Sequence, residues 1–191
     1  MNIIGIFLAA SLIDNVLLMR FLGLCPFIGM SSDVNKSVGM GLAVTFVMVM
    51  ATAVTWPLYH FVLVPLNLSF LQILVFILVI ASLVQLVEFF LKKNVPGLYA
   101  SMGIYLPLIT TNCAILAVTF DNISKGYNLL EAVVYAVGVA AGFLVAMVLM
   151  AGLRDRMRTA PIPKFLQGTP ILFAATSLLA VAFMGFSGLI K

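Results

Sequence analysis

The chain has 191 residues, of which 64% are hydrophobic and only 8% are charged. Ordinary soluble domains carry about 25% charged residues to cover their surface, so this composition excludes a soluble globular protein and leaves no room for a soluble catalytic domain. The formal charge of +4 comes from lysines and arginines in short loops, which indicates membrane topology rather than nucleic-acid binding. We therefore expect an all-α integral membrane protein with one domain over residues 1–191.

Apolar segments, taken in chain order, predict six transmembrane helices, because one span needs roughly 20 apolar residues. The first segment has no basic leader and contains acidic, amide and basic residues, which a cleaved signal peptide would not contain. Glu88 is the only charged residue between Lys36 and Lys92, so we expect two spans there, separated by a turn-like stretch at residues 57–67. The predicted spans are residues 2–24, 38–59, 71–91, 98–120, 129–153 and 170–190.

The distribution of positive charge predicts the orientation of these spans. Lysine and arginine concentrate in the cytoplasmic loops of membrane proteins. The loops after the first, third and fifth spans are therefore expected in the cytoplasm, and both termini outside. The odd loops hold Lys36, Lys92, Lys93, Arg154, Arg156, Arg158 and Lys164, whereas the opposite side holds only Lys125 and Lys191.

The two cysteines indicate an internal repeat. Cys25 and Cys113 are 88 residues apart, and the same offset carries the second and third spans approximately onto the fifth and sixth. Each half, about residues 1–95 and 96–191, therefore has three spans. Because three is odd, the second half enters the membrane from the opposite side, which predicts two inverted three-helix repeats.

Each cysteine lies in a segment that is unlike an ordinary span. The sequences are Phe21-Leu-Gly-Leu-Cys-Pro-Phe-Ile-Gly29 and Leu106-Pro-Leu-Ile-Thr-Thr-Asn-Cys113. The first segment has two glycines and a proline around its cysteine, and the second has a proline and three polar residues before its cysteine. These residues predict that the first helix of each repeat is broken near its cysteine. Broken spans at matching positions of two inverted halves are typical of a functional site, so Cys25 and Cys113 are the candidate site residues.

Two thiols in a membrane either pack as small hydrophobic side chains or bind a metal, which compensates the thiolate charge. A structural zinc ion and a 2Fe-2S cluster each take four ligands. If they bind metal, Cys25 and Cys113 form only half of a site. A second chain, either a copy or a relative, must then supply the other half.

Four motifs closely resemble the A subunits of Rnf electron-transport complexes, and the resemblance covers nearly the whole chain. They are Phe21-Leu-Gly-Leu-Cys-Pro-Phe27, Gly39-Met-Gly-Leu-Ala43, Leu106-Pro-Leu-Ile-Thr-Thr-Asn-Cys-Ala114 and Ala182-Phe-Met-Gly-Phe-Ser-Gly188. A sister family, the E subunits of sodium-pumping NADH:quinone reductases, shares most of this pattern but typically lacks a proline after the first cysteine. Pro26 therefore favours the Rnf family.

The resemblance implies membership of an ion-translocating ferredoxin:NAD+ oxidoreductase in a prokaryotic inner membrane, with no complete active site of its own. It implies an intramembrane 2Fe-2S cluster, with Cys25 and Cys113 as two ligands and two more from a paralogous E subunit of opposite orientation. Other subunits would carry flavin and further iron-sulfur centres. Electron relay across the membrane would be coupled to Na+ or H+ movement.

Charged residues inside predicted spans are the candidates for ion handling. Glu88 is one, because an acidic residue recurs at the matching place in related families, although pairing with a lysine one turn on is an alternative. Asp14 is the other, with Arg20 considered as its partner. The small-residue stripe Gly138, Gly142 and Ala146 predicts close helix packing.

Two other functions remain open at the level of the sequence. Inverted repeats with broken first helices also build small secondary transporters, although this chain is short and has few polar groups for binding a solute. The chain would otherwise be a structural component whose cysteines pack in the core.

Overall fold

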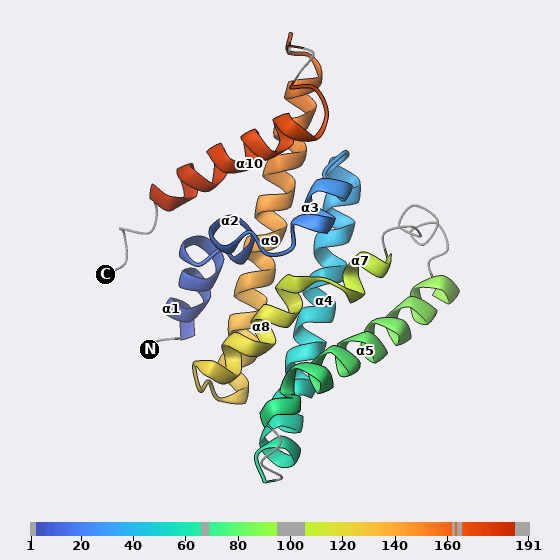
Figure 1. Cartoon of the computed structure of the whole chain (residues 1–191), viewed down its shortest axis with the longest axis vertical. Coiled ribbons are helices and arrows are strands. Elements are labelled where there is room, and N and C mark those ends of the chain that lie inside the picture. The colour runs from blue at the N-terminus through green and yellow to red at the C-terminus, as the bar shows by residue number, and fades with distance from the viewer. Residues whose placement is uncertain (1–2, 66–68, 95–105, 162, 164–165, 186–191) are drawn as a thin grey trace.

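In the computed structural model, the regular secondary structure of the described residues, which are 3–65, 69–94, 106–161, 163 and 166–185, is entirely helical (Figure 1). The all-α prediction is therefore confirmed. In chain order the helices are α1 (Ile3–Leu8), the π-helical turn η1 (Ala9–Ile13), α2 (Val16–Arg20), α3 (Leu24–Met30), α4 (Val34–Leu58), the π-helical turn η2 (Tyr59–Leu63), the 3-10 turn η3 (Ser69–Leu71), α5 (Gln72–Asn94), α7 (Leu106–Thr110), α8 (Cys113–Ser124), α9 (Leu129–Arg158) and α10 (Thr169–Met184).

Three helical stretches of the described chain are long and apolar enough to cross a membrane, and they match the second, third and fifth predicted spans. They are Val34–Leu63, Gln72–Phe90 and Leu129–Arg158. Shorter apolar helices, Ile3–Ile13, Leu108–Ser124 and Thr169–Met184, overlap the other three predicted spans. Residues 98–105 and 186–190 of those spans, and the repeat boundary at residues 95 and 96, lie outside the described residues, so the total of six spans stays a prediction.

The centre of the molecule is the pair α4 and α9, which lie side by side and run in opposite directions (Figure 1). Their contact is lined by buried methionines and small residues, among them Met40, Met48, Ala140 and Met147. Large apolar side chains instead cover the outside of α5 and α10. This exposure of large apolar side chains is expected where lipid rather than water surrounds the protein.

The small-residue stripe on α9 holds the N-terminal helices. A Cβ atom at Gly142 would lie 2.5 Å from the carbonyl oxygen of Ser11, and one at Gly138 would lie 3.0 Å from that of Phe7. The carbonyl of Gly142 also accepts a hydrogen bond of 2.9 Å from Asn15 Nδ2. The predicted packing role is confirmed, and the stripe places α1 and η1 directly on α9.

Two predicted helix ends are wrong. The expected turn at residues 57–67 begins too early, because α4 passes through Pro57 and the chain stays helical to Leu63. The missing donor of Pro57 is accommodated next to the wider π-helical turn η2. At the other end of the molecule, α9 continues to Arg158 rather than stopping at residue 153. Its last basic residues therefore lie on a helix, where they also interact favourably with the C-terminal end of the dipole.

Candidate functional site

The break predicted near Cys25 lies between α2 and α3, and an earlier interruption lies at Asp14 and Asn15, between η1 and α2. The chain between α2 and α3 contains two left-handed residues, Phe21 with φ 54° and Gly23 with φ 86°. Glycine adopts this conformation readily, whereas phenylalanine does so at a steric cost. Pro26 does not cause the break, because it is the third residue of α3, where a backbone N–H has no acceptor within the helix. The predicted break is confirmed, but its cause is the left-handed backbone.

The second break lies immediately before Cys113. Here α7 ends at Thr110 and α8 begins at Cys113. Asn112 caps α8, since its Oδ1 accepts a hydrogen bond of 3.0 Å from the N–H of Ala114, which is a common function of asparagine at this position. Pro107 is the second residue of α7, so it again occupies a helical first turn rather than the break.

The fold brings the two breaks together. The backbone N–H of Gly23 donates a hydrogen bond to Cys113 Sγ over 3.0 Å. A Cβ atom at Gly23 would lie 3.0 Å from Phe143 Cε2 and 3.3 Å from Asn112 Oδ1, so glycine allows this close approach. Cys25 follows two residues later and is exposed, while Cys113 is half-buried. One thiol is therefore held within the chain and the other faces outward.

The donors around Cys113 suit a charged or metal-bound sulfur. A neutral thiol is a weak hydrogen-bond acceptor, whereas thiolates and cluster sulfurs are stabilised by backbone N–H groups. The Gly23 N–H is such a donor to Cys113 Sγ. Asn112, the residue before Cys113, has its Nδ2 buried without a hydrogen-bond partner among the described residues. Among the residues that the structure describes, no group of three or more His, Cys, Asp or Glu side chains could hold a metal ion. Cys25 and Cys113 are the chain's two cysteines, so a centre with four thiolate ligands there would need two more from another chain.

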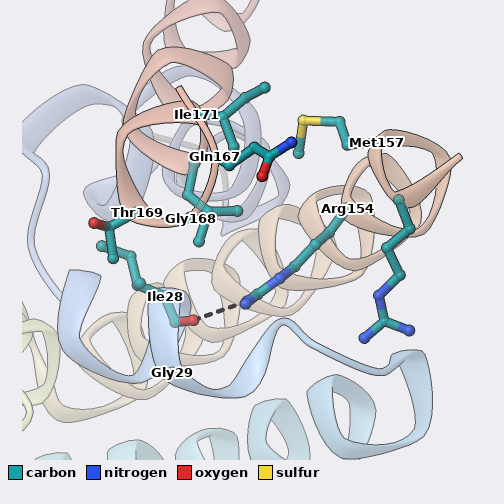
Figure 2. Close-up of a pocket in the computed structure, with 10 residues that line it drawn as sticks. Ile28, Gly29, Arg154, Met157, Gln167, Gly168, Thr169 and Ile171 are labelled. Atoms are coloured by element: carbon teal, nitrogen blue, oxygen red, sulfur yellow. Dashed lines mark hydrogen bonds between the residues drawn. The ribbon is translucent and has the colours of Figure 1, made fainter. Parts of the chain in front are cut away.

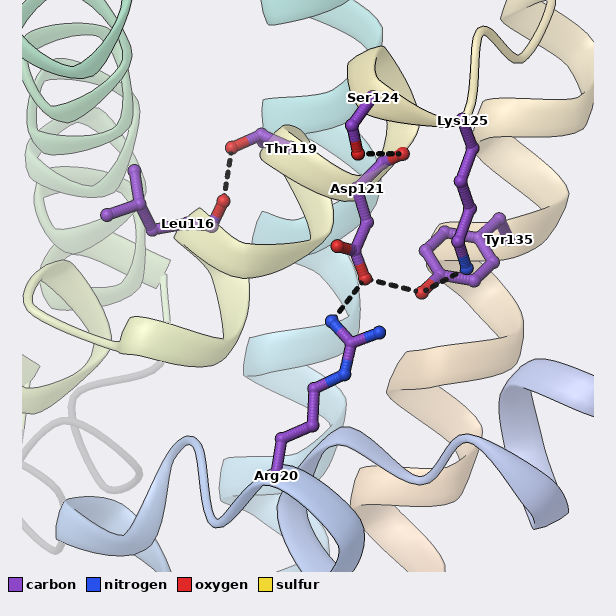
Figure 3. Close-up of polar contacts among 7 residues, drawn as sticks. All are labelled: Arg20, Leu116, Thr119, Asp121, Ser124, Lys125 and Tyr135. Carbon is purple, nitrogen blue, oxygen red and sulfur yellow. Dashed lines mark hydrogen bonds and ion pairs between the residues drawn. The ribbon is translucent and has the colours of Figure 1, made fainter. Parts of the chain in front are cut away.

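An ion pair links the segments that carry the two cysteines. Arg20 Nη1 lies 2.8 Å from Asp121 Oδ2, and the Tyr135 hydroxyl donates a bond of 2.9 Å to the same oxygen (Figure 3). Lys125 Nζ lies 4.4 Å from the centre of the Tyr135 ring. The partner of Arg20 is thus Asp121 rather than Asp14, the residue considered from the sequence.

The charge of Asp121 also acts on the turn between α8 and α9. Burial, followed by the negative charges of Glu131 and Asp121, raises the pKa of Tyr127 above its ordinary value. Glu131 itself is fixed at the start of α9, because its Oε2 accepts a 3.1 Å bond from the N–H of Asn128. This turn keeps its tyrosine neutral beside two carboxylates.

Sequence reasoning did not identify Asp121. It lies 101 residues from Arg20, and no local spacing connects the two. The only signal in the sequence was the internal repeat, which predicts that the two cysteine segments lie together. Arg20 lies just before the first cysteine, and Asp121 lies eight residues after the second. Placing the two cysteine segments side by side would have brought these charges into range.

The two ion-handling candidates lie on other elements. Glu88 is half-buried on α5, one turn before Lys92 near the end of that helix. Asp14 is half-buried where η1 ends, and its N–H donates a 2.8 Å bond to the carbonyl of Ala9. The structure does not bring Glu88 and Asp14 onto one helix or onto the helices of the two cysteines.

Comparison with known proteins agrees with the resemblance seen in the motifs. A family model described as "Rnf-Nqr subunit, membrane protein" matches residues 3–190. The chain is 53% identical to the A subunit of an ion-translocating oxidoreductase complex from Syntrophotalea carbinolica, over 99% of this chain and 98% of that protein. It is 51% identical to the A subunit of a Na(+)-translocating ferredoxin:NAD(+) oxidoreductase complex from Acetobacterium woodii, with the same coverage.

A third relative carries a different cation in its name. The A subunit of a proton-translocating ferredoxin:NAD(+) oxidoreductase complex from Clostridium ljungdahlii is 50% identical over 97% of this chain and 96% of its own length. Because the family model and these relatives cover nearly every residue, the chain belongs to the Rnf-Nqr family of membrane protein subunits.

Proposed function

We propose that this chain is the A subunit of an ion-translocating ferredoxin:NAD+ oxidoreductase complex. A subunits of ion-translocating oxidoreductase complexes at 50% to 53% identity over almost the whole chain support the assignment, and two of them are named as ferredoxin:NAD(+) oxidoreductase subunits. Their names include both Na+ and H+ as the translocated cation, so the proposal covers ion translocation without naming the ion. As one member of a complex, the chain works only with the other subunits.

We also propose that Cys25 and Cys113 provide two of the four thiolate ligands of an intramembrane 2Fe-2S cluster. The hydrogen bond from Gly23 N–H to Cys113 Sγ carries this proposal. It joins the two broken segments at a sulfur atom, which packing of inert cysteines does not require. Bound there, the cluster would supply one-electron transfer. The chain's own residues would hold the two sulfurs, and the Gly23 N–H would donate a hydrogen bond to one of them.

The other two ligands would come from a paralogous E subunit of opposite orientation. The exposure of Cys25 supports this arrangement, since an outward-facing thiol is available to a neighbouring chain. The antiparallel α4 and α9, each preceded by a broken cysteine segment and followed by a third helix, support the inverted repeat on which such pairing depends (Figure 1). Such a pair of related subunits would enclose the cluster between them.

The test is to purify the complex and record electron paramagnetic resonance (EPR) spectra after reduction, before and after Cys25→Ser and Cys113→Ser. Each substitution should abolish the signal of one 2Fe-2S centre and leave the signals of the other centres. Ser82→Ala on α5 is a matched control, because this exposed hydroxyl bonds only to its own helix, at Leu78. If the wild-type complex lacked this 2Fe-2S centre, or if both cysteine variants kept its full EPR signal, the thiols would have only a structural role.

Glu88 and Asp14 are proposed to contribute to the ion path. An acidic residue within a membrane span is a functional candidate by default, because its charge is costly there. Glu88→Gln should lower ion uptake at matched electron flux, whereas unchanged uptake would reject its role. Asp14→Asn is tested in the same assay. A secondary transporter, by contrast, would move its solute without any electron donor.

We propose a prokaryotic inner-membrane location with both termini outside. The excess of positive charge on the α9 end that carries Arg154, Arg156 and Arg158 supports this orientation. A reporter that functions only outside the cytoplasm should be active when it is fused after residue 191, and a reporter that functions only in the cytoplasm should be inactive there. Activity of a cytoplasmic reporter at that position would reverse the assignment.

A further inference from the structure

A cavity of about 520 Å³ lies where α9 ends and α10 begins, beside the end of α3 (Figure 2). Its lining combines charged, polar and apolar groups. Arg154 and Arg158 come from α9, the segment from Gln167 to Thr169 leads into α10, and Ile28 comes from α3. The cavity therefore has a positively charged wall, at the end of α9 that also carries Arg156.

A second cavity of about 470 Å³ adjoins the first between α9 and α10. The two share Met157 and Ile171 in their linings. The second cavity is lined only by apolar side chains, such as Leu153, Ala174 and Leu178. A charged compartment thus opens onto an apolar groove that follows α10.

The charged compartment keeps an excess of positive charge. Arg154 Nη1 donates to the Ile28 carbonyl over 3.1 Å and to Ser31 Oγ over 3.2 Å. Arg158 Nη2 donates to the Ser32 carbonyl over 3.4 Å. These acceptors are neutral, so they fix the guanidinium groups without compensating their charge.

The nearby carboxylate of Asp33 compensates the arginines only in part. Its Oδ2 lies 3.0 Å from Lys36 Nζ, so Lys36 is its ion-pair partner, while Arg154 and Arg158 act on it more weakly, as more distant charges. Each guanidinium also has five N–H donors, and the bonds described above use only a few of them. The arginines therefore retain both charge and donors for a further ligand.

We propose that the two cavities bind one anionic phospholipid, with its phosphate against Arg154 and Arg158 and one acyl chain in the groove between α9 and α10. Guanidinium groups bind phosphate by charge-assisted, often bidentate hydrogen bonds. Basic pockets at the end of membrane helices are suited to anionic headgroups. A free phosphate would leave the apolar groove unfilled, and an apolar helix of a neighbouring protein would leave the arginine charge uncompensated.

The experiment uses the purified complex and a phosphatidylglycerol probe that carries a photoactivatable diazirine on its acyl chain. After illumination and digestion, mass spectrometry measures the label on peptides from α10. We expect strong labelling that an otherwise identical phosphatidylcholine probe does not reproduce. Arg158→Gln should reduce the label about fivefold, the factor that corresponds to about 1 kcal/mol per basic residue near a lipid surface.

Two matched controls separate the proposal from general effects of charge or size. Arg156→Gln changes an exposed arginine of the same helix that lines neither cavity, so it should leave the label unchanged. Ala174→Phe should fill the groove and remove the label, whereas Ala182→Phe, an exposed position on α10 outside the groove, should not. Arg154 is not substituted, because its bonds also hold α3.

Four results would overturn the proposal. Equal labelling by the two probes, or no change in Arg158→Gln, would show that the arginines do not select the lipid. Competition by soluble glycerol phosphate as strongly as by phosphatidylglycerol would show that only the headgroup binds. No label on α10 in the wild-type complex would show that the acyl chain does not occupy the groove.

Discussion

At the scale of single residues, Gly23 is constrained in two ways. It combines a left-handed backbone with a Cβ direction that points at Phe143 Cε2, only 3.0 Å away. Gly23→Ala should therefore lower the free energy of unfolding by about 2–3 kcal/mol, since it adds conformational strain to overpacking. Because the Gly23 N–H bonds to Cys113 Sγ, the same variant should also shift the EPR spectrum of the proposed cluster.

Gly126 provides the control for backbone strain. It too is left-handed, with φ 64°, but nothing lies within 4 Å of its Cβ direction. Gly126→Ala should cost only about 1 kcal/mol and leave the spectrum unchanged. Thermal unfolding in detergent compares the two variants. Equal destabilisation and equal EPR spectra in the two variants would contradict the close approach of Gly23 to Phe143 and Cys113.

Asp121 is the residue whose loss should loosen the link between the cysteine segments. Its Oδ2 receives hydrogen bonds from both Arg20 and Tyr135. Asp121→Ala should lower the free energy of unfolding by about 2–3 kcal/mol, because the variant strands two donors, one of them charged. Asp121→Asn should cost less, because an amide oxygen still accepts a hydrogen bond. Thermal unfolding of the complex measures both.

The ion pair between Asp33 and Lys36 is the matched control, since both side chains are about half exposed. The hydrogen bond and charge of Lys36 hold the pKa of Asp33 below its usual range, so the pair stabilises the fold above that range and loses its effect as the pH falls. Asp33→Asn should change stability little at neutral pH. A loss as large as that in Asp121→Ala would contradict the special role of the Arg20 and Asp121 pair.

At the scale of elements, the contact of α9 with η1 depends on the absence of a side chain at Gly142. A methyl group there would lie 2.5 Å from a backbone oxygen of Ser11, and backbone cannot move aside as a flexible side chain does. Gly142→Ala should therefore destabilise the chain by about 3 kcal/mol. Gly152→Ala, on the same helix but facing open space, should be neutral or stabilise by up to about 1 kcal/mol. Similar unfolding temperatures for the two variants would contradict this packing.

The elements also show how far sequence patterns reach. Hydropathy predicted the helical class and the long helices, because a membrane requires long apolar segments. The breaks were predicted from glycines, polar residues and prolines together. The left-handed backbone of Phe21 and Gly23 makes the first break, whereas Pro26 and Pro107 lie in helical first turns. Pro57 likewise failed as a stop signal. Proline lacks the N–H that would donate a helical hydrogen bond. In a first turn that N–H has no acceptor within the helix, so the effect of a proline depends on its position.

Contacts between distant segments were outside the reach of local pattern. The approach of Gly23 to Cys113 followed only from the repeat, and the pairing of Arg20 with Asp121 was not found. Such contacts depend on how α8 packs on the central helices, which no spacing within one segment specifies. The stripe on α9 was predictable because small residues spaced by four share one helix face.

For the whole molecule, one thiol held inside the chain and one exposed thiol make a site that this chain alone does not complete. The chain purified without its partner should therefore lack a 2Fe-2S spectrum, and iron should appear only after coexpression with the paralogous E subunit. The purified pair should contain about two irons, and removal of iron by a chelator should weaken the association of the two proteins, because bridging ligands would be lost. Iron analysis and size-exclusion chromatography measure both effects. A complete cluster in a dimer of this chain alone would instead assign the second half-site to a copy, because Cys25 would then meet its own equivalent across the interface.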